Sequence, residues 1–244
     1  MAFLLSMFKK AKIESPEPRV LRRNFHPKDK GKDKITPITH NAMIDIETLS
    51  TKPNASIFSI ACVIFNTDEK KIDKFFIDKI RINVSLFEQS QLGLDIDQDT
   101  CNFWLCSDEK LEIFDLLTKD AVPLKDALEV LSSFIKNHNV SRVWANSPTF
   151  DAIILENAYR ACGIGEKIPW KFWQLMDVRT VSNLSLRKMK GYQYKDEKTR
   201  FNQEILEFDK TTLSNHDPLY DCYLQILIIQ NQLLIDEKIK GYDS

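Results

Sequence analysis

Three short apolar runs follow one another closely in the first third of the 244-residue chain. They span residues 41–47, 55–66 and 71–84, and the second run is rich in β-branched and aromatic side chains. Such residues fit the pleated surface of a sheet, and short links between strands favour antiparallel pairing. The pattern therefore predicts an antiparallel meander of three strands.

Helical and strand patterns alternate after this meander. Apolar residues recur at spacings of three and four over residues 124–135, which is typical of an amphipathic helix. The patterns also predict a strand at 142–146, a helix at 150–162, a strand at 172–176 and a last helix from about 218 to 237. This order predicts an α/β fold with a mixed five-stranded sheet flanked by helices.

The first 40 residues differ in composition from the remainder of the chain. Residues 1–38 carry ten Lys or Arg and four acids, a net charge of +6, and the whole chain has −1, which leaves −7 for the other residues. Four prolines stand among these charges, as is typical of linkers. We predict a basic, flexible leader at 1–40 and a single domain at 41–240. Such a leader can hold nucleic acid, an anionic membrane surface or a partner, or it can be a solvated arm.

Cysteine usage and hydropathy bear on the compartment. The five cysteines form no CxxC pair and do not cluster with histidine, so neither a disulfide framework nor a zinc site is predicted. No run reaches the roughly 18–20 apolar residues that span a bilayer. The apolar start of the leader precedes its charges, whereas a secretory signal has the opposite order. We expect no membrane span and a cytoplasmic location, in the host cytoplasm if the chain is viral.

Four acids stand in two kinds of local setting. Asp45 and Glu47 are two residues apart at the end of a predicted strand, so their side chains leave the same face. Asp151 and Asp221 each lie three residues after the proline of a predicted helix cap, at Ser147-Pro148 and Asp217-Pro218. Both are expected in the first turn of a helix, where the helix dipole favours an ionised carboxylate. Taken singly, each acid could equally well be a solvated or helix-stabilising residue.

A histidine and a metal requirement connect these acids. If the four carboxylates converge, their repulsion raises their pKa values, and a hard divalent cation relieves it. Oxygen ligands favour Mg²⁺ or Mn²⁺, and two such ions about 4 Å apart can catalyse in-line phosphodiester hydrolysis. His216 directly precedes the second cap. A lone histidine is more often structural, but beside these acids a neutral imidazole can take a proton from the attacking water.

Four segments carry the acids and the histidine in order along the chain: MIDIETL at 43–49, WANSPTFD at 144–151, KFWQLMDVRT at 171–180 and HDPLYD at 216–221. In this combination they resemble the DnaQ-like DEDDh family of 3′–5′ exonucleases. The closest likeness is to the phage exodeoxyribonuclease A group, with ribonuclease T-like exoribonucleases as relatives. The resemblance covers about residues 41–236 and implies a ribonuclease H-like fold, which agrees with the predicted order of strands and helices.

The resemblance also implies roles for the motif residues. It places the first metal ion on Asp45, Glu47 and Asp221, with Asp45 reaching the second ion. Asp151 would act mainly through a water on the metal, and His216 would be the general base. Asp177 and Arg179 match a family motif, and we expect a helix cap and an ion pair from them. The basic leader has no counterpart in the family.

Substrate contacts are implied or suggested at five further positions. Thr48 and Leu49 would meet the terminal nucleotide, and Asn146 and Phe150 would line the pocket for the 3′ end. Trp104 stands where relatives often have two tryptophans, and it could stack on a base or belong to the core. The basic segment 187–200 has two tyrosines between its charges, which suits a single strand, although a mobile surface loop explains it equally well.

These observations predict a metal-dependent 3′–5′ exonuclease that releases nucleoside monophosphates from single strands. DNA is favoured over RNA because the closer likeness is to a deoxyribonuclease group, and relatives often act as pairs of chains. Three alternatives remain open. They are an exoribonuclease of the same fold, a catalytically silent nucleic-acid-binding module, and an aspartyl-phosphate phosphatase in which Asp45 would be the nucleophile.

Overall fold

A computed structural model describes residues 40–67, 75–106, 119–186 and 216–240 of the chain. The predicted leader at 1–40 lies outside the described residues except for its last position, and so does the basic segment at 187–200. The predicted third strand is described only from residue 75 onward.

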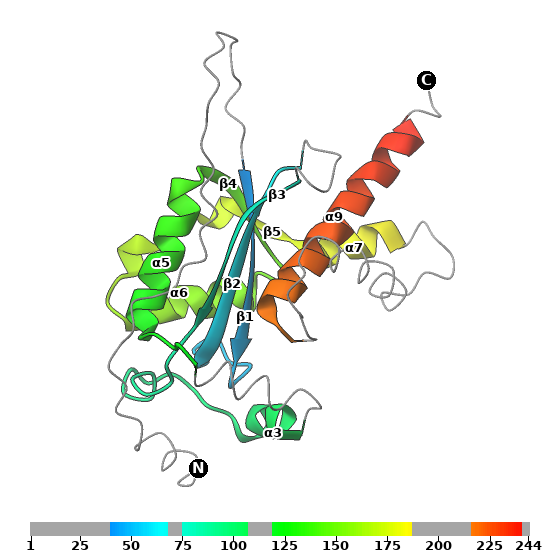
Figure 1. Ribbon diagram of the computed structural model, residues 1–244. Helices are drawn as coiled ribbons and strands as arrows, with labels where there is room; N and C mark the ends of the chain where they lie inside the picture. Colours follow the sequence, from blue (N-terminus) through cyan, green and yellow to red (C-terminus); the bar gives the residue numbers. More distant parts are fainter. Residues whose placement is uncertain (1–39, 68–74, 107–118, 187–215, 241–244) are drawn as a thin grey trace.

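A five-stranded mixed sheet forms the centre of the molecule, with the strand order β3-β2-β1-β4-β5 (Figure 1). The first three strands pair antiparallel as a meander, and β4 and β5 join parallel to β1 and to each other. The strands are β1 His40–Thr48, β2 Ile57–Phe65, β3 Phe76–Asn83, β4 Val140–Ala145 and β5 Leu175–Asp177. The predicted meander and the mixed five-stranded sheet are therefore confirmed.

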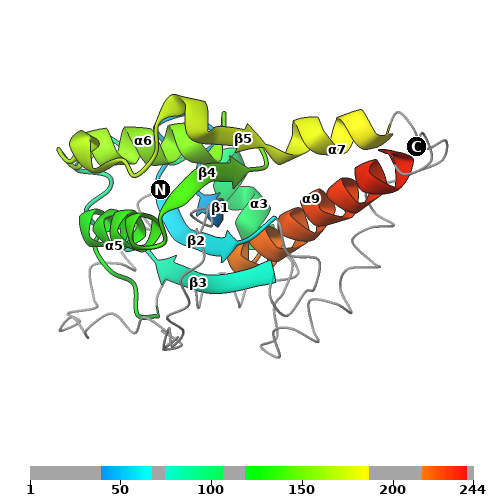
Figure 2. The same ribbon diagram turned by 90° about the horizontal axis from the view of Figure 1, so that it is seen from above.

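Helices cover both faces of the sheet (Figure 2). On one face α5 and α6 contact β2 and β1, and on the other α9 contacts β1 and β2, with α7 beside it. The described helices are α3 Gln98–Cys106, α5 Leu124–Asn137, α6 Asp151–Ala161, α7 Val178–Leu186 and α9 Pro218–Lys240, with short 3-10 turns at Gly165–Lys167 and Phe172–Gln174. None of these helices is both long and apolar enough to cross a membrane.

The alternation of β1 divides the core into two parts. Ala42, Ile44 and Ile46 pack with the residues of α5 and α6, whereas Met43 packs with the residues of α9. Successive side chains of a strand point to opposite faces, so the odd-numbered residues of β1 face α9. This alternation directs the side chains at positions 45 and 47 toward the helix that carries Asp221.

Two predicted element boundaries are corrected by the structure. Helix α6 begins at Asp151, not at Pro148, because Ser147–Phe150 form a separate turn and the Ser147 hydroxyl bonds Thr149 Oγ1 at 2.8 Å instead of capping the helix. The predicted fifth strand at 172–176 is mostly a 3-10 turn, and the strand itself is Leu175–Asp177. Asp151 still lies in the first turn of its helix, as expected.

The face of the sheet under α5 depends on leucines that are fully buried. Leu128 has no exposed surface, and truncation of a buried leucine costs about 2–5 kcal/mol. We expect Leu128→Ala to lower the free energy of unfolding by that amount in urea titrations. Leu105→Ala, at a side chain that is 59% exposed, should stay within about 0.5 kcal/mol of the wild type. Equal losses in the two variants would contradict the assignment of this core.

Candidate active site

The site lies at the carboxyl end of β1, where helices α6 and α9 begin. Single ligand atoms of Glu47, His216 and Asp221 lie within 4.8 Å of one another. The carboxyl of Asp45 is close enough to Glu47, Asp151 and Asp221 for all three to raise its pKa. The structure therefore brings together the four acids and the histidine that the sequence predicts as one site.

Asp151 is fixed to the strand that carries the first two acids. Its Oδ1 accepts a hydrogen bond of 3.2 Å from the backbone N–H of Ile46, between Asp45 and Glu47. The Asp151 side chain is only 3% exposed. This bond joins the start of α6 directly to β1.

The start of α9 is fixed by a cap that the sequence predicts. Asp217 Oδ1 accepts a hydrogen bond of 2.9 Å from the backbone N–H of Leu219, and Arg81 Nη1 donates to Asp217 Oδ2 at 2.5 Å. A capping carboxylate satisfies backbone donors that the first helical turn leaves free. The cap holds Asp221 in the first turn, where its backbone N–H bonds the Asp217 carbonyl oxygen at 3.0 Å.

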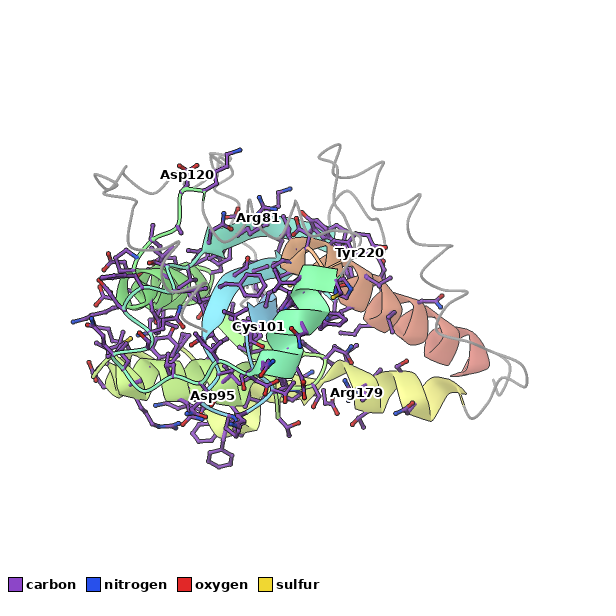
Figure 3. The ribbon with its side chains drawn as sticks, turned by 90° about the horizontal axis from the view of Figure 1, so that it is seen from below. Arg81, Asp95, Cys101, Asp120, Arg179 and Tyr220 are labelled. Atoms are coloured by element: carbon purple, nitrogen blue, oxygen red, sulfur yellow. The ribbon has the colours of Figure 1, made fainter. Side chains whose placement is uncertain are left out.

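Helix α3 lies beyond the end of the sheet, as Figure 3 shows by the label of Cys101 on this helix. The rings of Phe103 and Trp104 meet the His216 ring edge-on, with centroid distances of 5.6 and 5.5 Å. Trp104 Nε1 donates a hydrogen bond of 2.8 Å to the carbonyl oxygen of Thr48. The two aromatic side chains therefore hold the imidazole of His216 beside the acids.

Burial and mutual repulsion dominate the electrostatics of the acids. The pKa values of Asp45 and Glu47 are well above their ordinary values. Burial is the largest cause, and repulsion from the neighbouring carboxylates raises both pKa values further. Burial also raises the pKa of Asp151 to about 7, although the Ile46 N–H and the Arg179 guanidinium act in the opposite direction. Crowded acids of this kind favour bound protons or a bound cation.

The residues present fit a divalent cation. Carboxylate oxygens are the ligands that Mg²⁺ and Mn²⁺ prefer, and the imidazole of His216 adds one nitrogen donor within the same 4.8 Å group. A cation would offset the repulsion that raises the pKa of Asp45 and of Glu47. The chemistry of the donor set therefore agrees with the predicted metal requirement.

An open pocket of about 600 Å³ adjoins the acids. Its wall includes Glu47 and three of the predicted substrate contacts, Thr48, Trp104 and Phe150. Trp104 is only 6% exposed and packs edge-on against Phe58, so it forms a rigid part of the wall. The pocket wall also includes polar residues of the loop after β1, namely Ser50, Thr51 and Lys52, and polar residues at and just before the start of α3, namely Asp97, Asp99 and Thr100.

The other two predicted substrate contacts take different positions. The side chain of Leu49 is 7% exposed and packs with Phe58, Leu86 and Trp104, so it supports the pocket wall from behind. The carbonyl oxygen of Asn146 accepts a bond of 3.4 Å from Arg179 Nη2. Neither Leu49 nor Asn146 is among the residues that line the pocket.

The structure also shows site residues that sequence reasoning missed. Gln225 Nε2 donates to Asp45 Oδ1 at 2.8 Å, and Phe103, 53% exposed, lines the pocket beside His216. The position of Gln225, four residues after Asp221 on a predicted helix, was the available signal. Asp177 forms the predicted cap by accepting bonds from Arg179 N and Thr180 Oγ1, but the Arg179 guanidinium turns to Asn146.

Comparison with known proteins gives the family. The model of the 3′–5′ exoribonuclease Rv2179c-like domain matches residues 40–233, which is most of the chain. The chain belongs to this family. No curated protein sequence matches the chain significantly. The family supports the predicted DnaQ-like nuclease class, but the finer likeness to the phage exodeoxyribonuclease A group is not confirmed by any of the comparisons.

Solved structures share the fold of this exoribonuclease-like domain. Cell-death related nuclease 4 (CRN-4) is similar with a TM-score of 0.55 and 12% identity, over 82% of this chain and 65% of that one. Escherichia coli exonuclease I in complex with a dT13 oligonucleotide is similar with a TM-score of 0.54 and 11% identity, over 84% of this chain and 43% of that one. The chain thus spans less than two thirds of each relative. The predicted ribonuclease H-like fold is confirmed.

The raised pKa of Asp151 predicts a pH dependence of stability in the metal-free protein. Its pKa is about 7 in the folded chain, against an ordinary value of 3.8. The folded state binds the proton more tightly, so the free energy of unfolding should fall as pH rises from about 4 to 7, by at most about 1.4 kcal/mol per pH unit for each such group. Urea titrations in EDTA at pH 5, 6, 7 and 8 would measure this slope.

The variant Asp151→Asn keeps an acceptor for Ile46 N–H but does not titrate. It should have a smaller pH slope than the wild type and a higher free energy of unfolding at pH 8 in EDTA. Added Mg²⁺ should stabilise the wild type most at pH 8, because the cation competes with the proton. Identical slopes for the two proteins would show that Asp151 is not desolvated as the structure indicates.

Proposed function

We propose that this chain is a metal-dependent 3′–5′ exonuclease that hydrolyses single-stranded nucleic acid to nucleoside monophosphates. The observation that carries the proposal is the convergence of Asp45, Glu47, Asp151 and Asp221 with His216 at the end of β1, beside an open pocket. Membership of a family described as 3′–5′ exoribonucleases supports the same reaction.

The side chains would divide the work by position. Asp45, Glu47 and Asp221 would hold one divalent ion, and Asp45 would also contact a second ion. Asp151 would contact the metal mainly through a metal-bound water. Two bound ions supply charge stabilisation for the attacking and leaving oxygens of an in-line displacement. A ring nitrogen of His216 would accept the proton of the attacking water. The edge-on contacts of Phe103 and Trp104 would keep this ring aimed at the acids.

The pocket suits the terminal nucleotide of a single strand. Phe150 and the exposed Phe103 present aromatic surface in the pocket wall, and aromatic rings stack on any base without strong sequence preference. Thr48 and Trp104 also line the pocket.

The choice between DNA and RNA has support on both sides. The family description names exoribonucleases, whereas the similar exonuclease I structure contains a DNA oligonucleotide. The predicted preference for DNA rested on the phage group, which the comparisons do not support. The predicted pairing of two chains and the predicted cytoplasmic location stay predictions, and sedimentation velocity would measure the pairing.

An end-labelled strand assay tests the proposal. Wild-type protein should shorten single-stranded RNA or DNA from the 3′ end with Mg²⁺ or Mn²⁺, release nucleoside 5′-monophosphates, and be inactive in EDTA. Labels at the 5′ and 3′ ends report polarity, and matched RNA and DNA strands report the sugar. Asp45→Asn should abolish hydrolysis without loss of the folded state by circular dichroism. Normal digestion by this variant, or tight strand binding without release of mononucleotides, would overturn the proposal.

A second prediction concerns the proposed general base. His216→Ala should lower the rate by about 10²–10⁴ at saturating metal, since loss of a positioned proton acceptor costs that much. His138→Gln is a suitable control because His138 lies beside His40, at the opposite end of β1. The control should keep wild-type activity. A rate for His216→Ala within threefold of the wild type would remove the general-base role.

A further inference from the structure

A glutamine of α9 contacts the first acid of the site directly. Gln225 follows Asp221 by four residues, so both side chains lie on the same side of the helix. Gln225 is 4% exposed, and its Nε2 donates a hydrogen bond of 2.8 Å to Asp45 Oδ1. This bond joins residues 180 positions apart in the chain. The same helix therefore presents one acid of the cluster and supports another.

Packing alone does not explain a glutamine at this position. The Oε1 atom of Gln225 is buried, and it has no hydrogen-bond partner among the residues that the structure describes. A buried acceptor without a partner destabilises a fold, whereas an apolar side chain of similar length would fill the space without that cost. The gain from the glutamine must therefore come from its other end, where Nε2 meets Asp45.

We propose that Gln225 is a positioning residue for the metal site. Its Nε2 donates a hydrogen bond to Asp45 Oδ1, which would fix the orientation of the carboxylate for metal binding. Groups that hydrogen-bond to ligand carboxylates orient them and commonly change metal affinity by about 10–100-fold. This inference rests on the proposed function, because it requires Asp45 to hold a metal ion.

Because Asp221 and Gln225 stand on one helix, the position of α9 sets the geometry of both. A shift of α9 relative to β1 would move Asp221 and would also break the hydrogen bond from Gln225 to Asp45. The contacts of α9 with β1 and β2, and the cap formed by Asp217 and Arg81, keep this helix in place. The support that Gln225 gives is therefore preorganised before any ion binds.

The test measures Mn²⁺ binding to the full chain by electron paramagnetic resonance, without substrate. Gln225→Met keeps the length of the side chain but removes the donor, and Gln225→Leu is a second apolar replacement. Both should bind Mn²⁺ about 10–100-fold more weakly than the wild type. The unfolding temperature of the metal-free variants should be unchanged or higher, because they lack the buried Oε1 atom that has no hydrogen-bond partner among the described residues. Gln230→Met, at a position on α9 that is 7% exposed, is the matched control and should bind as the wild type does.

Exonuclease rates provide an independent readout. In Gln225→Met the Mg²⁺ concentration for half-maximal rate should rise by the same factor as the Mn²⁺ dissociation constant, and high Mg²⁺ should restore most of the maximal rate. Wild-type affinity in both Gln225 variants would overturn the inference, as would equal weakening in Gln230→Met or a matching loss of unfolding temperature. If the wild type binds no Mn²⁺, both the proposed function and the inference about Gln225 fail. If the wild type binds and both Gln225 variants bind equally well, only the inference fails.

Discussion

Repulsion among buried carboxylates is the interaction on which the site depends. Asp45, Glu47 and Asp151 all have raised pKa values with burial as the main cause, and Asp221 contributes to the repulsion at each of them. A fold does not keep such a group without compensation, since each desolvated charge is costly. The few compensating contacts that the structure shows, from Ile46 N–H, Gln225 and Arg179, are weak next to a divalent cation. This imbalance agrees with the proposal that a divalent cation binds among these carboxylates.

Local sequence patterns were sufficient for much of this architecture. Alternation along β1 predicted that Asp45 and Glu47 share a face, and the Asp217 cap predicted where α9 begins. Both are short-range properties, which depend on neighbouring residues and on the geometry of a strand or a helical turn. The fold class followed from the order of such elements.

Other features depend on contacts that local patterns do not contain. The pairing register of β1 shifts between Glu47 and Thr48, so the alternation that places the acids does not extend to Leu49, which packs behind the pocket. The Ser147 hydroxyl bonds a nearby threonine, which delays the start of α6. The bond from Gln225 to Asp45 joins distant parts of the chain and becomes visible only when α9 lies on the sheet.

The order of the site along the chain has a consequence for biosynthesis. The first acids stand on the first strand of the sheet, and the last acid stands on the final described helix, so a ribosome translates the two parts far apart in time. Emerging polypeptide that ends before α9 lacks His216 and Asp221 altogether. The proposed site is therefore complete only after nearly all of the domain has left the exit tunnel.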